Sequence, residues 1–254
     1  MIILKSRAEI EKMRAAGRVV HKVLQETGKA VAPGVTTGEL EDIASRIISE
    51  SGGSSPFLGY APVGHPPYPA WTCISVNEEI VHGIPGRRVL KEGDIVTIDC
   101  GVELNGYMAD SAWTFPVGRV SPQTQRLLKV TEEALYKGIA QARPGHRISD
   151  ISRAVQRHAE SHGYSVVREL TGHGVGRSLH EEPQVPNYGT SGRHIFLECG
   201  MTFAIEPMVN AGRKDIKYLD DRWTIVTADR SLSAHFEHTV AITDKGMEIL
   251  TNGD

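Results

Sequence analysis

An Asn-Gly pair at positions 105 and 106 limits what this chain can fold into more than any other short feature of its sequence. Both central residues of a type I′ turn need positive φ, so Asn-Gly between two strand-like runs is the strongest short-range signal for a β-hairpin. A two-residue turn places Leu104 opposite Tyr107 and thereby sets the pairing along both strands. The sequence therefore predicts a long hairpin with one fixed register.

The predicted hairpin places two carboxylates on one face. In its register Asp99 lies opposite Ala112 and shares its face with Asp110, whereas the other face is apolar. The two aspartates are then diagonal neighbours, roughly 7–8 Å apart at the backbone. Like charges at this spacing favour the neutral acids unless a cation lies between them. On the hairpin alone, solvent exposure of one Asp or pairing with an Arg explains the pattern equally well.

Helices are predicted in two pairs, one on each side of this hairpin in the sequence. Capping boxes and N-terminal serines start them at Ser6, Thr36, Ser121 and Ser149. The first helix has about five turns, and the two pairs end near Gly52 and at Gly163. The pairs match at one common offset of 111 residues. This match predicts a degenerate twofold repeat, with halves of roughly 1–118 and 119–254 in a single catalytic domain, 1–254.

Strand-like runs follow each pair of helices. They cover 72–76, 94–103, 107–115, 202–205, 223–227 and 236–242. Helices and strands in separate runs indicate the α+β class. A Pro-rich stretch, 57–71, is predicted to be a surface loop, and loops of this length are often functional.

Charge and composition exclude several classes of protein. The 254 residues carry 28 Lys and Arg against 31 Asp and Glu, a net charge of −3, with no long run of one sign. This argues against a basic nucleic-acid face, so no DNA partner is predicted. No apolar run reaches the ~20 residues of a membrane span, and the N-terminus lacks the apolar core of a secretory signal. Three cysteines without CxxC spacing fit a reducing compartment. We expect a soluble, cytoplasmic protein with no membrane partner.

The second half of the chain supplies further candidate ligands. His173 lies in a glycine-rich segment, where other groups can approach the backbone closely. Glu206 and Glu237 lie at the edges of two apolar strands, and each alone is more readily explained by an ion pair than by a metal. Together with Asp99 and Asp110 they form a set that can stay ionised only with about two divalent cations. Oxygen-rich sites favour Mn, Fe, Co or Mg, and two such ions form a hydrolytic centre.

Five segments around these residues resemble those of the type I, bacterial-type methionine aminopeptidases of metallopeptidase family M24. They are Ile-Asp99-Cys-Gly, Asp110, Thr-Gly-His173-Gly-Val-Gly, Glu206-Pro-Met-Val and Phe-Glu237-His-Thr, in the family's order and spacing. The match runs from about Leu4 to Thr251. It implies the pita-bread fold, in which two pseudo-symmetric halves surround a curved antiparallel sheet covered by helices, in agreement with the predicted repeat.

The resemblance also implies a role for each of the five residues. Asp99 would chelate one metal ion, Asp110 and Glu237 would bridge the pair, and His173 and Glu206 would hold the second ion. Glu206 would in addition relay protons for the bridging water.

Two more histidines match substrate-facing positions of the family. By that resemblance His180 would contact the scissile carbonyl oxygen, and His82 would assist near the scissile nitrogen. Without the resemblance, each would be explained as an ordinary surface or hydrogen-bonded histidine.

The family's methionine pocket maps onto Tyr60, Tyr68, Cys73, Leu179 and Trp223. There an unbranched thioether would lie against aromatic rings, although core packing also explains Cys73 and Trp223. The sequence departs from the family's pattern in four places. Leu179 stands where an aromatic is common, Phe57 where a small residue or Cys is common, and Gly101 where a hydroxyl residue is frequent; the loop 61–70 is several residues longer. These departures concern the pocket and the substrate range.

The function implied is removal of the initiator methionine from nascent proteins and peptides, with preference for a small second residue. It would use two divalent ions per chain, Co, Mn, Fe or Zn, and act as a monomer on nascent polypeptide N-termini, as at the ribosome. An X-Pro aminopeptidase or prolidase-like peptidase shares the fold and ligands but normally carries a large N-terminal domain that this chain has no room for. A non-enzymatic peptide-binding relative predicts eroded ligands, whereas all five are present.

Overall fold

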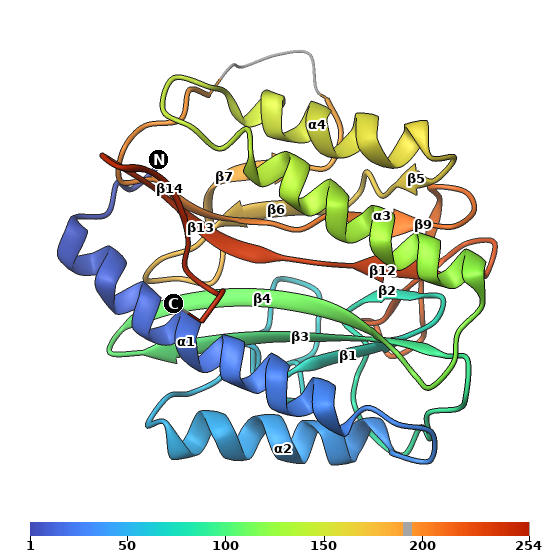
Figure 1. Ribbon diagram of the computed structural model, residues 1–254. Coiled ribbons are helices and arrows are strands. Elements are labelled where there is room, and N and C mark those ends of the chain that lie inside the picture. Colours follow the sequence, from blue (N-terminus) through green and yellow to red (C-terminus); the bar gives the residue numbers. More distant parts are fainter. Residues whose placement is uncertain (190–194, 254) are drawn as a thin grey trace.

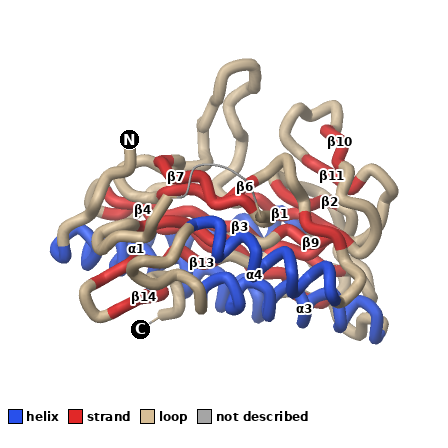
Figure 2. The backbone as a smooth tube through the Cα atoms, turned by 90° about the horizontal axis from the view of Figure 1, so that it is seen from above, coloured by secondary structure: helices blue, strands red, loops and turns tan. Residues whose placement is uncertain are grey.

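The computed structural model describes residues 1–189 and 195–253 of the chain. Its helices are α1 (Arg7–Ala30), α2 (Thr37–Glu50), α3 (Pro122–Ile139) and α4 (Ile148–Ser161). These helices lie along one side of a layer of strands, and loops rise from the other side (Figure 2). The first pair of helices covers one half of the layer and the second pair covers the other half (Figure 1).

The strands fall into several antiparallel sheets. Those before α3 are β1 (Cys73–Val76), β2 (Glu79–Val81), β3 (Ile95–Leu104) and β4 (Tyr107–Pro116). Those after α4 are β5 (Ser165–Val166), β6 (Thr171–Gly174), β7 (Glu181–Pro186), β8 (Thr202–Ile205), β9 (Met208–Asn210), β10 (Ile216–Tyr218), β11 (Ile225–Thr227), β12 (Ser233–His235), β13 (His238–Thr243) and β14 (Gly246–Ile249). The hairpin belongs to a three-stranded sheet of order β1-β3-β4, and the second half of the chain forms a five-stranded sheet of order β14-β13-β8-β6-β7. The order helix, helix, strands therefore occurs twice.

The predicted hairpin and its register are confirmed. β3 and β4 pair over their whole length around the turn at Asn105, where φ is 55°. Leu104 pairs with Tyr107 and Asp99 with Ala112. Because the pairing has no slip, both aspartates lie on the face that the sequence predicts for them.

The helices differ from the predictions at two ends. Ser6 and Thr36 cap α1 and α2 as expected, but α1 continues past five turns to Ala30. It does so because its buried face continues to Thr27, whose hydroxyl donates to the Val23 carbonyl oxygen. α4 begins before the predicted Ser149, because the Asp150 carboxylate accepts from the backbone N–H of Arg147.

The predicted strand 236–242 is wrong at its start. The chain forms β12 up to His235 and leaves strand geometry at Phe236 and Glu237, before β13 begins. The Glu237 N–H there donates to the carbonyl oxygen of Ala112 on β4, at 2.9 Å. This single hydrogen bond ties the second half of the chain to the hairpin at the point where Asp99 and Ala112 pair.

Two large apolar clusters hold the strands to the helices. One packs α1 and α2 against β1, β3 and β4, and includes Val20, Leu40 and Ile98. The other packs α3 and α4 against the strands of the second half, and includes Leu135 and Phe203. Trp113 packs against both clusters.

None of the helices within residues 1–189 and 195–253 combines the length and the apolar character that a membrane span requires.

Candidate active site

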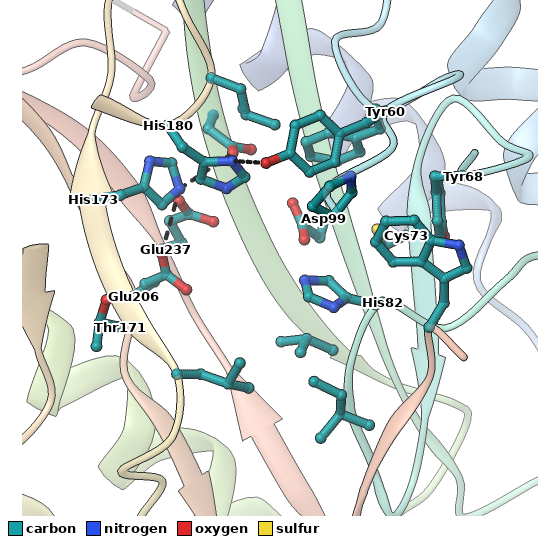
Figure 3. A pocket seen from close by; sticks show the side chains of 18 of the residues that line it. Tyr60, Tyr68, Cys73, His82, Asp99, Thr171, His173, His180, Glu206 and Glu237 are labelled. Carbon is teal, nitrogen blue, oxygen red and sulfur yellow. Dashed lines mark hydrogen bonds and ion pairs between the residues drawn. The ribbon is translucent and has the colours of Figure 1, made fainter. Parts of the chain in front are cut away.

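A cavity of about 580 Å³ opens between the two halves of the strand layer. In Figure 3, His173, Glu206 and Glu237 lie on one side of the cavity, Tyr68 and Cys73 lie on the other, and Asp99 lies between them. We call the part lined by the five predicted ligands the polar wall and the part lined by the predicted methionine pocket the apolar wall. The two walls meet where Asp99 pairs with Cys73. The five predicted ligands come from β3 and β4, from β6, and from the segments that follow β8 and precede β13.

The four carboxylates reach this cavity from two pairs of strands. Asp99 and Asp110 come from the β3–β4 hairpin. Glu206 follows β8 and Glu237 precedes β13, and these strands pair so that Ile205 lies opposite His238. The two glutamates are therefore neighbours at one end of that pair. The backbone hydrogen bond from Glu237 to β4 then places all four beside one another.

His173 joins the carboxylates from β6, which pairs with β8. Its Nε2 lies 3.5 Å from Glu206 Oε1 and 4.0 Å from Asp110 Oδ2. Its Nδ1 lies 3.0 Å from the Gly174 carbonyl oxygen, which can only accept, so Nδ1 carries the hydrogen and the Nε2 lone pair faces the carboxylates. This is the arrangement of a metal-ligating histidine. Asp110, His173 and Glu237 each place one ligand atom within 4.8 Å of the others.

The electrostatics of this wall favour a cation. Burial and mutual repulsion raise the pKa values of Asp99, Glu206 and Glu237, and burial raises that of Asp110 to about 7. One oxygen each of Asp99, Asp110 and Glu237 is buried without a hydrogen-bond partner. Among the described lining residues there is no Lys or Arg, so pairing with Arg does not explain the carboxylates. A divalent cation, which would bind these oxygens and keep them ionised, fits this donor set.

His180 and His82 also face the cavity (Figure 3). His180 Nδ1 lies 2.9 Å from the Tyr60 hydroxyl, and the His180 and His173 rings are 4.3 Å apart. Burial lowers the pKa of His180 and, together with the charge of His180, lowers that of His82 to about 4. Both rings are therefore neutral at pH 7, and each has one N–H to donate.

The predicted methionine pocket is a compact apolar cluster. Tyr68, Cys73, Leu179 and Trp223 are buried in it together with Phe57, whereas Tyr60 lies at its rim, 36% exposed. Two of its aromatic members form hydrogen bonds with the chain. The Tyr68 hydroxyl donates to the carbonyl oxygen of Gly83, and the Trp223 Nε1–H to that of Pro66. The predicted loop 57–71 forms no helix or strand, but it contributes buried residues to this wall.

Two of the four departures from the family pattern occupy the same space. A Cβ added to Gly101 would lie 2.9 Å from Phe57 Cε1 and 2.8 Å from Pro56 Cγ. Phe57 and Pro56 together therefore fill the space that a side chain at position 101 would occupy. The sequence places these residues far apart, and only the fold shows that one departure accommodates the other.

His235 is a polar cavity residue that the sequence did not lead us to expect. His235 is 2% exposed, and neither of its ring nitrogens has a hydrogen-bond partner. Its Nε2 lies 3.8 Å from Glu237 Oε2 and 4.0 Å from Glu206 Oε2. Burial and the nearby His82 lower its pKa to about 3. The available signal was its position two residues before Glu237, next to a predicted strand, although the chain leaves strand geometry between the two residues.

The chain is similar to proteins of known family. The model of metallopeptidase family M24 matches residues 11–244. Methionine aminopeptidase 1 of Bacillus subtilis is 53% identical over 251 residues, covering 99% of each chain. Methionine aminopeptidase of Escherichia coli is 46% identical over 252 residues, covering 98% of this chain and 94% of the relative.

Solved structures agree with the sequence comparisons. Methionine aminopeptidase from Thermotoga maritima has a TM-score of 0.94 at 46% identity and covers 99% of both chains. Prolidase from Pyrococcus furiosus has a TM-score of 0.76 at 23% identity and covers 98% of this chain but 65% of its own, so it shows the fold alone. The fold is the α+β pita-bread fold that the resemblance implied. The chain belongs to metallopeptidase family M24 and, within it, to the type I, bacterial-type methionine aminopeptidases.

Proposed function

We propose that this protein is a metal-dependent aminopeptidase that removes the N-terminal, initiator methionine from nascent proteins and peptides with a small second residue. The observation that carries the proposal is the cavity itself, in which buried carboxylates without a cationic side chain lie beside a buried aromatic and thiol cluster. The polar wall suits hydrolysis and the apolar wall suits a methionine side chain. The relatives' names support the same activity.

The five ligands would hold two divalent ions, of Co, Mn, Fe or Zn. Asp99 would bind one ion, Asp110 and Glu237 would bind both, and His173 and Glu206 would bind the other. Bound divalent ions lower the pKa of a water and polarise a carbonyl oxygen. The buried oxygens without partners and the direction of the His173 lone pair support this assignment.

Glu206 is the proposed general base and proton carrier. Its side chain lines the cavity and is more exposed than those of Asp110 and Glu237, and its pKa is raised by burial and by the charge of Asp110. A carboxylate with a raised pKa accepts a proton more readily near neutral pH and can then deliver it to the leaving amine.

His180 is the proposed hydrogen-bond donor to the scissile carbonyl oxygen, and His82 assists near the scissile nitrogen. If the Tyr60 hydroxyl donates to His180 Nδ1, the ring hydrogen lies on Nε2. An N–H fixed in this way stabilises the charge that develops on the carbonyl oxygen.

The substrate's methionine side chain would lie among Tyr60, Tyr68, Cys73, Leu179 and Trp223. A flexible thioether makes favourable contacts with aromatic rings, which a branched side chain matches less well. The Tyr68 and Trp223 rings pack edge to face with centroids 5.2 Å apart, so the aromatic surface of this wall is formed by the protein itself. The preference for a small second residue comes from the resemblance to the family.

We further propose that residues 1–254 form one catalytic domain of two halves, roughly 1–118 and 119–254. It acts as a monomer in the cytoplasm on nascent polypeptide N-termini, as at the ribosome, with no DNA or membrane partner. The bacterial relatives and the net charge of −3 without a basic run support this setting.

The test is metal-dependent release of methionine. The protein is treated with a chelator, Mn, Fe, Co or Zn is restored singly, and Met-Ala-Ser is compared with peptides that begin with Leu or Pro and with a Xaa-Pro dipeptide. Release of Met alone, only after metal is restored, supports the proposal. Xaa-Pro cleavage would favour a prolidase-like peptidase. Binding of the peptide without cleavage under every metal would favour a non-enzymatic relative.

A further inference from the structure

A second group of metal-ligating side chains lies outside the cavity, where α3 meets α4. Glu133 on α3 and His158 and His162 at the end of α4 each place one ligand atom within 4.8 Å of the others. None of the three lines the cavity. We propose that they form a separate site for a borderline divalent cation such as Zn²⁺.

Spacing along and between the helices brings the three groups together. His158 and His162 are four residues apart and share a face of the helix, with ring centroids 4.6 Å apart. α3 runs beside α4 (Figure 1), and His158 Nε2 lies 3.0 Å from Glu133 Oε2. Two ligands of one tetrahedral ion with bonds of about 2 Å lie roughly 3.3 Å apart. The pair is therefore already close to the separation that a shared ion requires.

The orientation of His162 leaves a lone pair free. Its Nδ1 lies 2.8 Å from the backbone carbonyl oxygen of His158. A carbonyl only accepts, so Nδ1 carries the hydrogen of the neutral ring and Nε2 carries the lone pair. Metal-ligating histidines almost always have a partner of this kind on the other nitrogen, because it fixes the ring.

The neighbouring charges also bear on the site. Lys129 Nζ lies 3.9 Å from Glu133 Oε1, and the Arg126 guanidinium donates to the His162 carbonyl oxygen. The Lys129 side chain is 76% exposed, so it can move into water when a cation binds Glu133. The positive charge of Lys129 therefore lowers the affinity of the site for a cation but does not prevent binding.

The donor set selects the class of ion. Two imidazoles and one carboxylate suit Zn²⁺, Ni²⁺ or Cu²⁺ better than Mg²⁺ or Ca²⁺, which prefer oxygen ligands. Three protein ligands leave a fourth position for water. Such an ion would link α3 to α4 and hold the two helices of the second half together.

The experiment counts Zn²⁺ per chain by equilibrium dialysis of the metal-loaded protein. His162→Ala and the nearly isosteric Glu133→Gln are compared with the wild type, and His21→Ala is the matched control, a half-buried helical histidine outside the group. We expect each test variant to bind one ion fewer per chain, or to bind that ion at least tenfold more weakly. Loss of the hydrogen-bond partner of a ligand lowers metal affinity by about 10–100-fold, and loss of the ligand itself should lower it at least as much. His21→Ala should bind as many ions as the wild type.

The outcome is independent of the proposed function. The measurement is a difference between variant and wild type, so it does not depend on how many ions the cavity holds. The variants should release methionine at the wild-type rate. Wild-type Zn²⁺ binding by both His162→Ala and Glu133→Gln would overturn the site and leave the proposed peptidase intact. If circular dichroism in chelator shows that His162→Ala does not fold, Zn²⁺ binding by Glu133→Gln, compared with the wild type, tests the proposed site by itself.

Discussion

The two walls of the cavity differ in how the protein satisfies its own polar groups. On the apolar wall, the Tyr68 hydroxyl and the Trp223 N–H both donate to backbone carbonyl oxygens. On the polar wall, oxygens of Asp99, Asp110 and Glu237 are buried without a partner. The first wall is complete in the folded chain, whereas the second requires a group that the chain does not contain. We therefore expect substitutions on the apolar wall to change stability and substrate fit, and substitutions on the polar wall to change catalysis and metal binding.

The largest effect should follow from Glu206→Gln on the polar wall. The amide retains one oxygen ligand but cannot accept the proton, so we expect kcat to fall by about 10²–10⁴-fold while most of the metal remains bound. Turnover and metal content measured on the same sample check this. Unchanged turnover would show that Glu206 is not the base, and complete loss of metal would show that it is chiefly a ligand.

His180→Ala should have the next largest effect. Removal of a donor to the developing oxyanion typically lowers kcat by about 10²–10³-fold. Because the contact strengthens in the transition state, kcat should fall more than KM rises. Steady-state kinetics on Met-Ala-Ser separates the two parameters. A change confined to KM would show that His180 stabilises the bound substrate and the transition state equally.

Gly101→Ala tests the coupling between Gly101 and Phe57 on the apolar wall. The added Cβ would lie 2.9 Å from Phe57 Cε1, so we expect a loss of roughly 1–3 kcal/mol in the free energy of unfolding. In a Phe57→Ala background the same change should cost less, although contact with Pro56 remains. Denaturant unfolding of the two single variants and the double variant measures this coupling. Strictly additive losses would contradict it.

The smallest effect is a pH dependence of the metal-free protein. A carboxyl pKa of about 7 for Asp110 means that, between the unfolded value near 4 and 7, the folded chain binds more protons than the unfolded chain. Stability therefore decreases as pH rises through that window and just above it. The buried histidines, with pKa values of about 3 to 4 in the folded chain against about 6.5 in the unfolded chain, oppose this trend up to about pH 7.5. The contribution of Asp110 is therefore measured as a difference from a variant that keeps these histidines.

Between pH 6.5 and 8 in chelator, deprotonation of Asp110 in the folded chain should lower the free energy of unfolding by about 1 kcal/mol. Denaturant unfolding of the wild type and of Asp110→Asn at the two pH values measures this loss as the difference between the two proteins. The variant should lack the loss that Asp110 causes. An Asp110→Asn variant whose stability changes with pH in the same way as that of the wild type would contradict the raised pKa of Asp110.

Local sequence predicted the elements that local chemistry controls. The Asn105–Gly106 turn fixed the hairpin register, and Ser6 and Thr36 fixed the starts of two helices, because turns and caps depend on a few adjacent residues. The prediction failed at residues 236 and 237, where a hydrogen bond to β4 takes the chain out of strand geometry. No local pattern encodes a partner that lies more than a hundred residues away in the sequence.

The resemblance identified the five candidate ligands correctly as neighbours, but their roles as ligands remain a prediction. The sequence by itself determined the family, the twofold order of elements and the face on which Asp99 and Asp110 lie, because period-2 alternation and turn chemistry are local. Only the tertiary structure decided that His235 faces the same carboxylates and that Phe57 fills the space over Gly101. Those contacts depend on distances between segments remote in sequence, which the packing of the two halves alone determines.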